Sequence, residues 1–274
     1  FLDNDLVIED KENQNEDIHT SSILETTTPN YTDKVYIESE RAFLVPLVED
    51  YKLSVSHFNN YLNIYYGEGP KTFFEQNLIR FPQPMSISNI FGSSIHKTIE
   101  LCLLKYKENK KLPTKEEFIN LFIKDLSKKR INELDLEKYL DRGRQALGIF
   151  YDEKIKDLLI TDKPEVDFGR EGVLVDGAHI TGKIDLLRVL EDGIVDVFDF
   201  KTGKAIPDKN KEEKDKVKEW SYKNQIIFYK LLIENSKNYK NYKMRNGVFI
   251  FVEPENNNGG FSINEKQLDF TEEE

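Results

Sequence analysis

The hydrophobic pattern of this chain changes its period near residue 165, and this change limits the folds that the chain can adopt. Before it, apolar residues recur at helical spacing in four segments, 51–66, 92–107, 114–134 and 137–160. After it, apolar and polar residues alternate in three segments, 166–175, 179–190 and 194–203. A further helix is predicted over 219–235, and a buried strand over 246–254. This order predicts an α/β fold in which a β-β-β-α-β core forms a central mixed sheet, flanked by an N-terminal helical part.

Local signals mark where some of these elements begin. Ser54 or Ser56 is the expected cap of the first helix, and Thr114 with Glu117 forms a capping-box pattern at the start of the third. The segment 80–89 is broken by Pro and Ser and is predicted to be a loop. The lysine-rich segment before the last helix, 208–218, is predicted to be a solvated loop.

The net charge of −11 is concentrated at the N-terminus. Residues 1–40 contain 11 Asp or Glu and two Lys or Arg, whereas residues 41–274 contain 39 and 37, so a polyanionic partner is not excluded. The polar residues 9–34 have no hydrophobic period, and the start on Phe1 is typical of a fragment of a longer polypeptide. We therefore expect an acidic arm or linker over 1–40, the end of an upstream region, and one folded domain over 41–274. Within this domain we expect a helical part and a β core, over 51–160 and 166–270.

The composition excludes several classes of protein. The single cysteine, Cys102, excludes an internal disulfide, a four-cysteine zinc site and an iron–sulfur cluster held by cysteines. No apolar run approaches about 20 residues, so we expect no membrane span. The N-terminus lacks the basic-then-apolar pattern of a secretory signal, and these features together predict a reducing, cytoplasmic setting.

The hairpin formed by the last two predicted strands brings charged residues together. With a three-residue loop over 191–193, the antiparallel register places Asp185 opposite Asp199, and Lys183 opposite Lys201. Alternate side chains of a strand share a face, so Asp199 and Lys201 are expected on the same surface as Asp185. Because opposed carboxylates repel each other, this register requires a compensating charge, and a bound divalent cation is the expected one.

Lys201 adds a positive group beside this expected cation. A lysine there would hold an attacking water or stabilise the charge that develops on a phosphate oxygen. Two carboxylates, a lysine and a hard cation suit phosphodiester hydrolysis, because the metal activates water and screens the anionic backbone. The alternative for an Asp-x-Lys pattern by itself is an ordinary ion pair on an exposed strand face.

Four segments together resemble the motifs of a known family. They are FGSSIHKTIE with His96, GKIDLL with Gly182 and Asp185, VFDFKTGK with Asp199 and Lys201, and NQIIFYK with Gln225 and Tyr229. Their order (a helix histidine, a GxxD strand, a DxK strand and a QxxxY helix) resembles the PD-(D/E)XK nuclease superfamily. Within it, the chain is most similar to the RecB-type nuclease domain of helicase–nuclease recombination enzymes.

The resemblance implies a restriction-endonuclease-like fold and a set of site residues. A Mg²⁺ or Mn²⁺ ion would be held by His96, Asp185, Asp199 and the backbone carbonyl of Phe200, with Glu171 as a supporting acidic residue. Catalysis would rest on Asp185, Asp199, Lys201, Gln225 and Tyr229. Thr202 and Lys204 would contact DNA phosphates. The iron–sulfur cluster of some relatives needs four cysteines and is therefore not expected.

The residues taken singly leave other roles open. His96 on its own fits a half-buried helix histidine that makes a hydrogen bond. Gln225 and Tyr229 share a helix face, which fits either a position over the active site and the DNA strand or simple packing on the sheet.

The function that the resemblance implies is a Mg²⁺- or Mn²⁺-dependent deoxyribonuclease. We expect an exonuclease that forms the C-terminal module of a UvrD-like helicase–nuclease in DNA recombination and repair, because LSVSHFNNYLN (53–63) resembles the segment leading into the nuclease of such fusions. The chain has no GxxxxGKS/T phosphate loop, so the helicase would lie upstream or on a partner chain. Two alternatives remain: a non-catalytic DNA-binding or scaffold module that keeps the nuclease fold, and an unrelated metal-binding α/β domain that acts on a small phosphoester.

Overall fold

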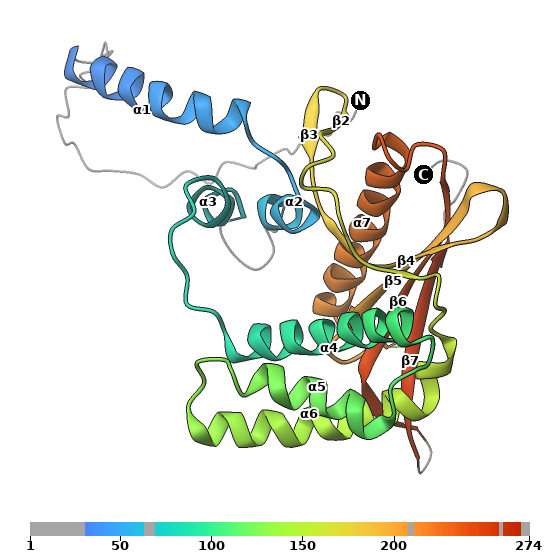
Figure 1. Ribbon diagram of the computed structural model, residues 1–274. Helices are drawn as coiled ribbons and strands as arrows, with labels where there is room; N and C mark the ends of the chain where they lie inside the picture. The colour runs from blue at the N-terminus through green and yellow to red at the C-terminus, as the bar shows by residue number, and fades with distance from the viewer. Residues whose placement is uncertain (1–30, 63–68, 208–210, 258–259, 270–274) are drawn as a thin grey trace, which may run out of the picture. The chain divides into compact units, whose positions relative to one another are not determined.

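The computed structural model describes residues 31–62, 69–207, 211–257 and 260–269 (Figure 1). The chain divides into two compact units, residues 1–45 and residues 46–274. Every element after α1 belongs to the second unit. Helix α1 (Tyr31–Glu49) crosses the boundary between the units. Most of the arm or linker expected over 1–40 lies outside the described residues, and its last residues, 31–40, are helical, which the sequence analysis did not predict.

The sequence analysis misses α1, and over residues 41–49 its apolar side chains form no buried stripe. Phe43, Val45 and Val48 are all exposed, and Pro46 lies inside the helix. A helix without an apolar face leaves no hydrophobic period in the sequence.

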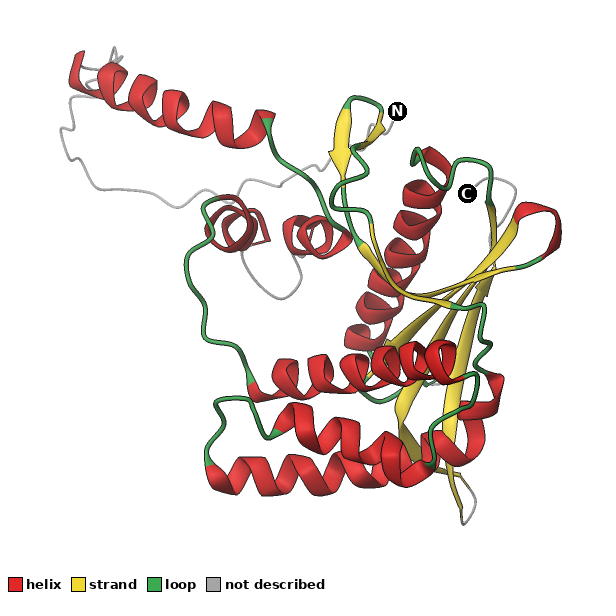
Figure 2. Cartoon of the chain, viewed as in Figure 1, coloured by secondary structure: helices red, strands yellow, loops and turns green. Residues whose placement is uncertain are grey.

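The central sheet has five strands in the order β1-β4-β5-β6-β7. Figure 2 draws the strands in yellow and the helices in red. Their bounds are β1 (Lys163–Asp167), β4 (Lys183–Val189), β5 (Ile194–Lys201), β6 (Lys243–Asn257) and β7 (Gly260–Asp269). β5 and β6 are parallel and the other neighbours are antiparallel, so the predicted mixed sheet is confirmed. Helix α7 (Glu213–Asn235) makes the crossover that two parallel strands need. The edge strand β7 was not predicted.

A small hairpin interrupts the strand pattern between β1 and β4. β2 (Val173–Val175) and β3 (Ala178–Ile180) pair with each other outside the central sheet. The predicted strands 166–175 and 179–190 are therefore each broken. The turn between β2 and β3 holds Asp176 and Gly177 at φ 48° and 83°, which is the Asp-Gly signal of a two-residue hairpin turn.

Helices cover both faces of the sheet. One hydrophobic cluster joins Phe200 of β5 to three helices, α4 (Ile87–Asn109), α5 (Lys115–Leu126) and α6 (Glu133–Lys154). A second cluster joins Val195 and Val197 of β5 to α7. Successive residues of β5 thus alternate between the two layers, which places Asp199 and Lys201 on the α7 side.

Capping residues explain where the helices differ from the predicted ranges. α4 begins five residues early, because Ser86 accepts a hydrogen bond from the Asn89 amide. The predicted capping box of Thr114 and Glu117 is confirmed, but α5 ends at Leu126 and Asn132 caps a separate helix α6. α7 begins at Glu213, so the second half of the lysine-rich segment is helical. The first residues of the lysine-rich segment, 208–210, lie outside the described part of the chain.

Short helical segments complete the described chain. α2 (Val55–Leu62) follows Ser54, as predicted, and the predicted end of that helix lies outside the described residues. The others are α3 (Gly69–Thr72), the π-helical turn η1 (Phe73–Leu78), and the 3₁₀ turns η2 (Ile155–Asp157) and η3 (Glu191–Gly193). Among the described helices, none combines the length and the apolar character needed to cross a bilayer.

The contact between α5 and α6 gives a test of the fold. A Cβ atom at Gly143 of α6 would overlap the ring of Phe122, which is fully buried in α5. Gly143→Ala should therefore lower the free energy of unfolding by about 1–3 kcal/mol through overpacking. Gly148→Ala, in the same helix, meets only Lys115 Cε at 3.5 Å and should be neutral or stabilising by up to about 1 kcal/mol. Urea unfolding of both variants measures the difference, and equal stabilities would contradict this packing.

Candidate active site

The candidate site lies where β4 and β5 cease to pair. Their register runs from Val189↔Val195 to Leu186↔Phe198, as predicted from the three-residue loop. Asp185 and Asp199 follow directly after the last pair. The carboxylate oxygen Oδ2 of Asp185 accepts a hydrogen bond from the backbone amide of Phe200 at 2.8 Å. A side chain thus takes the place of a strand partner at this fork.

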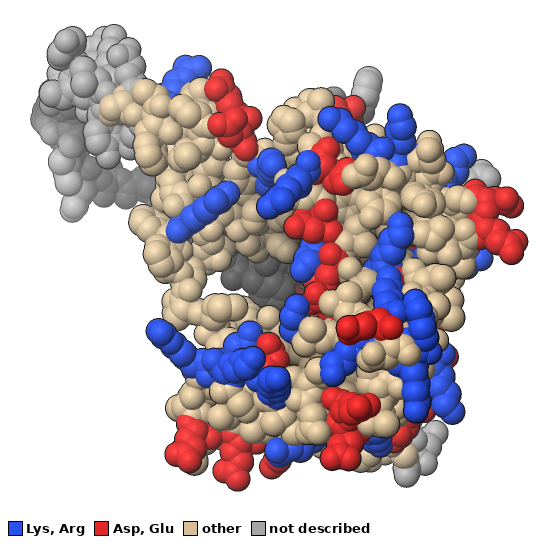
Figure 3. Space-filling view, viewed as in Figure 1, with Lys and Arg blue, Asp and Glu red and all other residues tan. Residues whose placement is uncertain are grey.

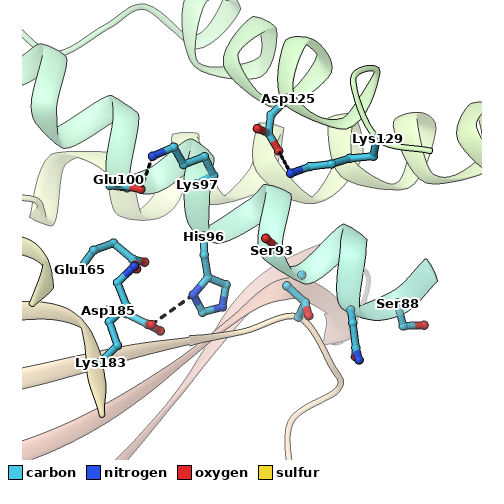
Figure 4. A pocket seen from close by; sticks show the side chains of 13 residues that line it. Ser88, Ser93, His96, Lys97, Glu100, Asp125, Lys129, Glu165, Lys183 and Asp185 are labelled. Atoms are coloured by element: carbon cyan, nitrogen blue, oxygen red, sulfur yellow. Dashed lines mark hydrogen bonds and ion pairs between the residues drawn. The ribbon is translucent and has the colours of Figure 1, made fainter. Parts of the chain in front are cut away.

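His96 joins Asp185 from the helical layer. The histidine points from α4 toward the strand, and its Nδ1 lies 3.2 Å from Asp185 Oδ1 (Figure 4). Glu165 of β1 is the third member: ligand atoms of His96, Glu165 and Asp185 all lie within 4.8 Å of one another. We call these three residues the His-Glu-Asp cluster.

Glu165 owes its place to the strand register and to an unusual backbone. The pairs Pro164↔Leu186 and Val166↔Ile184 put Glu165 opposite Asp185. Its φ of 51° lies in the left-handed region, which costs a residue other than glycine about 1–3 kcal/mol. The Glu165 carboxylate also makes an ion pair of 2.5 Å with Lys183.

The charges of the cluster shift the pKa values of its members. Burial lowers the pKa of His96, but the charge and hydrogen bond of Asp185, aided by Asp199 and Glu165, outweigh burial and raise it to about 9. Burial and then the charge of Asp199 raise the pKa of Asp185, against the opposing effect of His96. At neutral pH the imidazole is therefore protonated and compensates part of the negative charge.

Asp199 is held from the opposite layer, by α7. Its carboxylate is 2% exposed, and its Oδ1 accepts hydrogen bonds of 2.8 Å from both Gln225 Nε2 and the Tyr229 hydroxyl. Gln225 Nε2 also contacts the Tyr229 hydroxyl at 2.7 Å. Burial, followed by the charge of Asp199, raises the pKa of Tyr229, so the phenol stays a donor. The predicted position of Gln225 and Tyr229 over the carboxylate is thus observed.

Lys201 closes this network. Its Nζ lies 2.7 Å from Asp199 Oδ2 and donates a hydrogen bond of 2.7 Å to Gln225 Oε1. The contact with Asp199 is an ion pair without hydrogen-bond geometry, and within the described residues Asp199 Oδ2 is a buried oxygen with no hydrogen-bond partner. This oxygen keeps a lone pair available for another partner.

The donor set suits a hard divalent cation. The His-Glu-Asp cluster offers one imidazole nitrogen and two carboxylates, and the charge of Asp199 reaches Asp185 strongly enough to raise its pKa. Nitrogen and oxygen donors of this kind accept Mg²⁺ or Mn²⁺. Asp199 itself does not belong to the group of atoms within 4.8 Å, so its predicted role as a ligand stays a prediction, as does that of the Phe200 carbonyl.

The remaining predicted residues lie at different distances from this centre. Thr202 lines the same cavity of about 700 Å³ as His96 and Asp185. Lys204 lies outside this cavity and lines another, next to Lys266. Glu171 lies in the turn after β1, where it accepts a hydrogen bond from Asn238. The prediction of a strand at Glu171 is therefore wrong, and its supporting role stays a prediction, whereas Glu165 of β1 lies in the cluster.

Sequence analysis misses Glu165 for two reasons: the predicted strand begins only at residue 166, and two acidic residues alternate along β1. Glu165 and Asp167 flank the buried Val166, and the alternation gives no reason to prefer either. The register that selects Glu165 depends on the β2–β3 hairpin, whose residues stand between β1 and β4. Counting residues along the chain therefore does not predict the β1–β4 register, because the length of the inserted hairpin is unknown from the sequence.

A model of one known protein family matches most of this chain. The family model of the PD-(D/E)XK nuclease superfamily matches residues 52–272. One solved structure, described as a "Putative exonuclease" from Eubacterium rectale, is 13% identical and covers 86% of this chain and 78% of its own, with a TM-score of 0.49. No curated protein sequence matches the chain. Because the family model spans most of the sequence, the chain belongs to the PD-(D/E)XK nuclease superfamily.

Proposed function

We propose that this nuclease is a divalent-metal-dependent deoxyribonuclease that hydrolyses phosphodiester bonds. The observation that carries the proposal is the pair of interlocked networks at the fork. The His-Glu-Asp cluster gathers metal-binding atoms, while Gln225 and Tyr229 fix Asp199 beside the ammonium group of Lys201. A non-catalytic scaffold would not require both networks to be intact.

The metal would be held by His96, Glu165 and Asp185, with Asp199 as the neighbouring carboxylate. When bound, a Mg²⁺ or Mn²⁺ ion would polarise the phosphate and lower the pKa of a water molecule. Compared with the set implied by the resemblance, this set adds Glu165, while Asp199 and the Phe200 carbonyl stay predicted ligands. The protonated imidazole of His96 must lose its proton to become a ligand, so the cation would take over its charge-compensating role.

The residues of β5 and α7 prepare the site for the substrate. Gln225 donates to Asp199 and accepts from Lys201, so one amide fixes the orientation of both charged groups. Lys201 thus presents a positive charge in a fixed place, which is the form in which a charge stabilises a transition state best.

Recognition of the substrate would depend on individual lysines. The face shown in Figure 3 carries acidic and basic side chains intermixed, without a broad patch of one sign. Several lysines of the active-site cavity are paired with acids: Lys97 with Glu100, Lys129 with Asp125 (Figure 4). The affinity for a polyanion would then come from specific phosphate contacts.

We further propose that the chain is an exonuclease module of a UvrD-like helicase–nuclease that acts in DNA recombination and repair. The segment 53–63, whose sequence suggests this context, forms α2 and is tied to α7. Asn59 Nδ2 donates to Ser221 Oγ at 2.9 Å, and Asn224 Nδ2 donates to Asn59 Oδ1 at 3.0 Å. A segment connected to the rest of a larger enzyme would thus be attached to the helix that bears Gln225 and Tyr229.

Substitution of Lys201 tests the proposed catalysis. Lys201→Ala should keep the fold and metal binding but lower cleavage of linear DNA roughly 100- to 1000-fold, because it removes one preorganised charge. Asp199→Ala should lose more, since it also removes the carboxylate next to the cluster. Rates are measured at saturating Mg²⁺ and low salt, with the exposed Lys216→Ala of α7 as the control.

A Lys201→Ala protein that cleaves at the wild-type rate would remove lysine from the mechanism and favour the binding-module alternative. The same preparations are assayed on closed circular DNA. Sparing of the circles supports an exonuclease, and their digestion would contradict it.

The two glutamates near β1 allow a matched test of the metal site. Glu165→Gln should weaken the apparent affinity for Mn²⁺ by about 10-fold or more, because a charged ligand becomes neutral. Glu171→Gln, which alters the contacts with Asn238 and Tyr239, should bind Mn²⁺ like the wild type. Cleavage rates over a Mn²⁺ titration in metal-stripped buffer measure both. Equal effects of the two substitutions would exclude the His-Glu-Asp cluster as the metal site.

A further inference from the structure

The face of α7 that bears Gln225 and Tyr229 extends two turns toward the start of the helix. Lys218 and Tyr222 precede Gln225 by seven and three residues, so all four side chains share one face. The ring of Tyr222 stacks on Phe249 of β6, with centroids 4.6 Å apart and an interplanar angle of 25°. The QxxxY pattern in the sequence therefore covers only part of this face.

The ring of Tyr222 has two ammonium groups near it. Lys201 Nζ lies 5.0 Å from the ring centroid, and Lys218 Nζ lies 5.6 Å from it. Lys218 Nζ also lies 6.0 Å from the ring of Phe251. Cation–π contacts of this kind hold a positive group in place without neutralising it.

Lys218 differs from Lys201 and Lys266 in its partners. Its Nζ donates one hydrogen bond, of 2.7 Å, to the backbone oxygen of Lys204. Among the described residues it makes no ion pair with a carboxylate, whereas Lys201 pairs with Asp199 and Lys266 pairs with Glu219. Since an ammonium group has three donors, two remain for a ligand.

The pKa of Lys218 is lowered by its half-buried position, because burial is the largest cause. The charge of Lys201 acts in the same direction, while the charges of Asp215 and Glu255 oppose the shift without reversing it. A half-buried cation beside another cation is stabilised strongly by a negative ligand. The attachment to Lys204 places this group next to the segment that follows the DxK strand.

We propose that Lys218 binds a phosphate of the substrate strand that flanks the phosphate being cut, with Tyr222 as the platform that holds Lys218 and Lys201 side by side. This inference rests on the proposed function, because it names a further contact of the same substrate. It adds a residue outside the four motifs to the substrate site.

The test compares Lys218→Met with Lys218→Arg. Methionine keeps much of the aliphatic stem that packs near Tyr222 and removes the charge. For a single-stranded substrate with Mg²⁺, kcat/KM of Lys218→Met should fall about tenfold, mainly through a higher KM, as expected for a lost charged hydrogen bond. The slope of log(kcat/KM) against log(salt) should become shallower by about 0.7, the value for one phosphate contact.

Two further variants separate binding from structure. Lys218→Arg should restore the salt slope, because it keeps the charge. Lys216→Met, on the outer face of the same helix and paired with Glu213, should leave both KM and the slope unchanged. If Lys218 only ties down the segment at Lys204, Lys218→Met would lower kcat or stability at the wild-type salt slope, and the proposal would fail.

Binding of the same oligonucleotide in the presence of a chelator separates this inference from the proposed function. A wild-type protein that binds with a Lys218-dependent salt slope but cleaves nothing would refute the nuclease activity and leave the phosphate contact standing. If the wild type cleaves, and Lys218→Met has the same KM and salt slope as Lys216→Met, the phosphate contact alone is refuted. If the wild type neither cleaves nor binds the oligonucleotide, both the nuclease activity and the phosphate contact are refuted.

Discussion

The hydrogen bond from the Phe200 amide to the Asp185 carboxylate is the contact on which the site depends. It forms where β4 and β5 separate, and it satisfies the Phe200 backbone donor with a side chain in place of a partner from β4. The same contact brings a carboxylate into a place where it is 12% exposed. A charge in such a place needs compensation, which His96 supplies from α4 and which a cation would supply more strongly. The separation of β4 and β5 thus forms the site and also places there a largely buried negative charge that requires a positive partner.

The two helical layers each contribute to this fork, and glycines let them come close. A Cβ atom at Gly92 of α4 would lie 3.1 Å from the Thr202 hydroxyl, at the end of β5. On the other face, a Cβ at Gly182 would lie 2.7 Å from Leu232 of α7, and one at Gly247 would lie 2.5 Å from Ile226. Close approach of α7 is what brings Gln225 and Tyr229 within hydrogen-bond distance of Asp199. Tight packing far from the carboxylates therefore positions the groups that hold them.

The sequence predicts best what short-range rules determine. The β4–β5 register follows from a three-residue loop, the α5 start follows from a capping box, and the shared face of Gln225 and Tyr229 follows from helical spacing. Each of these depends on residues within one element or one turn. The family motifs then place His96, which no local pattern connects to Asp185.

What the sequence does not predict depends on contacts between distant segments. Glu165 faces Asp185 only because the β2–β3 hairpin returns the chain to the sheet, and its left-handed φ leaves no mark in the alternation. Edge strand β7 packs few of its side chains into the core, so its pattern is weak. Helix α1, which is also missed, shows no buried apolar stripe over residues 41–49.

The central claim is that one divalent cation is held by His96, Glu165 and Asp185 at the strand fork. Crystals grown with Mn²⁺, measured near the manganese absorption edge, test it directly through the anomalous difference map. The account predicts one strong peak in contact with an imidazole nitrogen of His96 and with carboxylate oxygens of Glu165 and Asp185. A peak beside Glu171, or no peak at a Mn²⁺ concentration that supports cleavage, would contradict it.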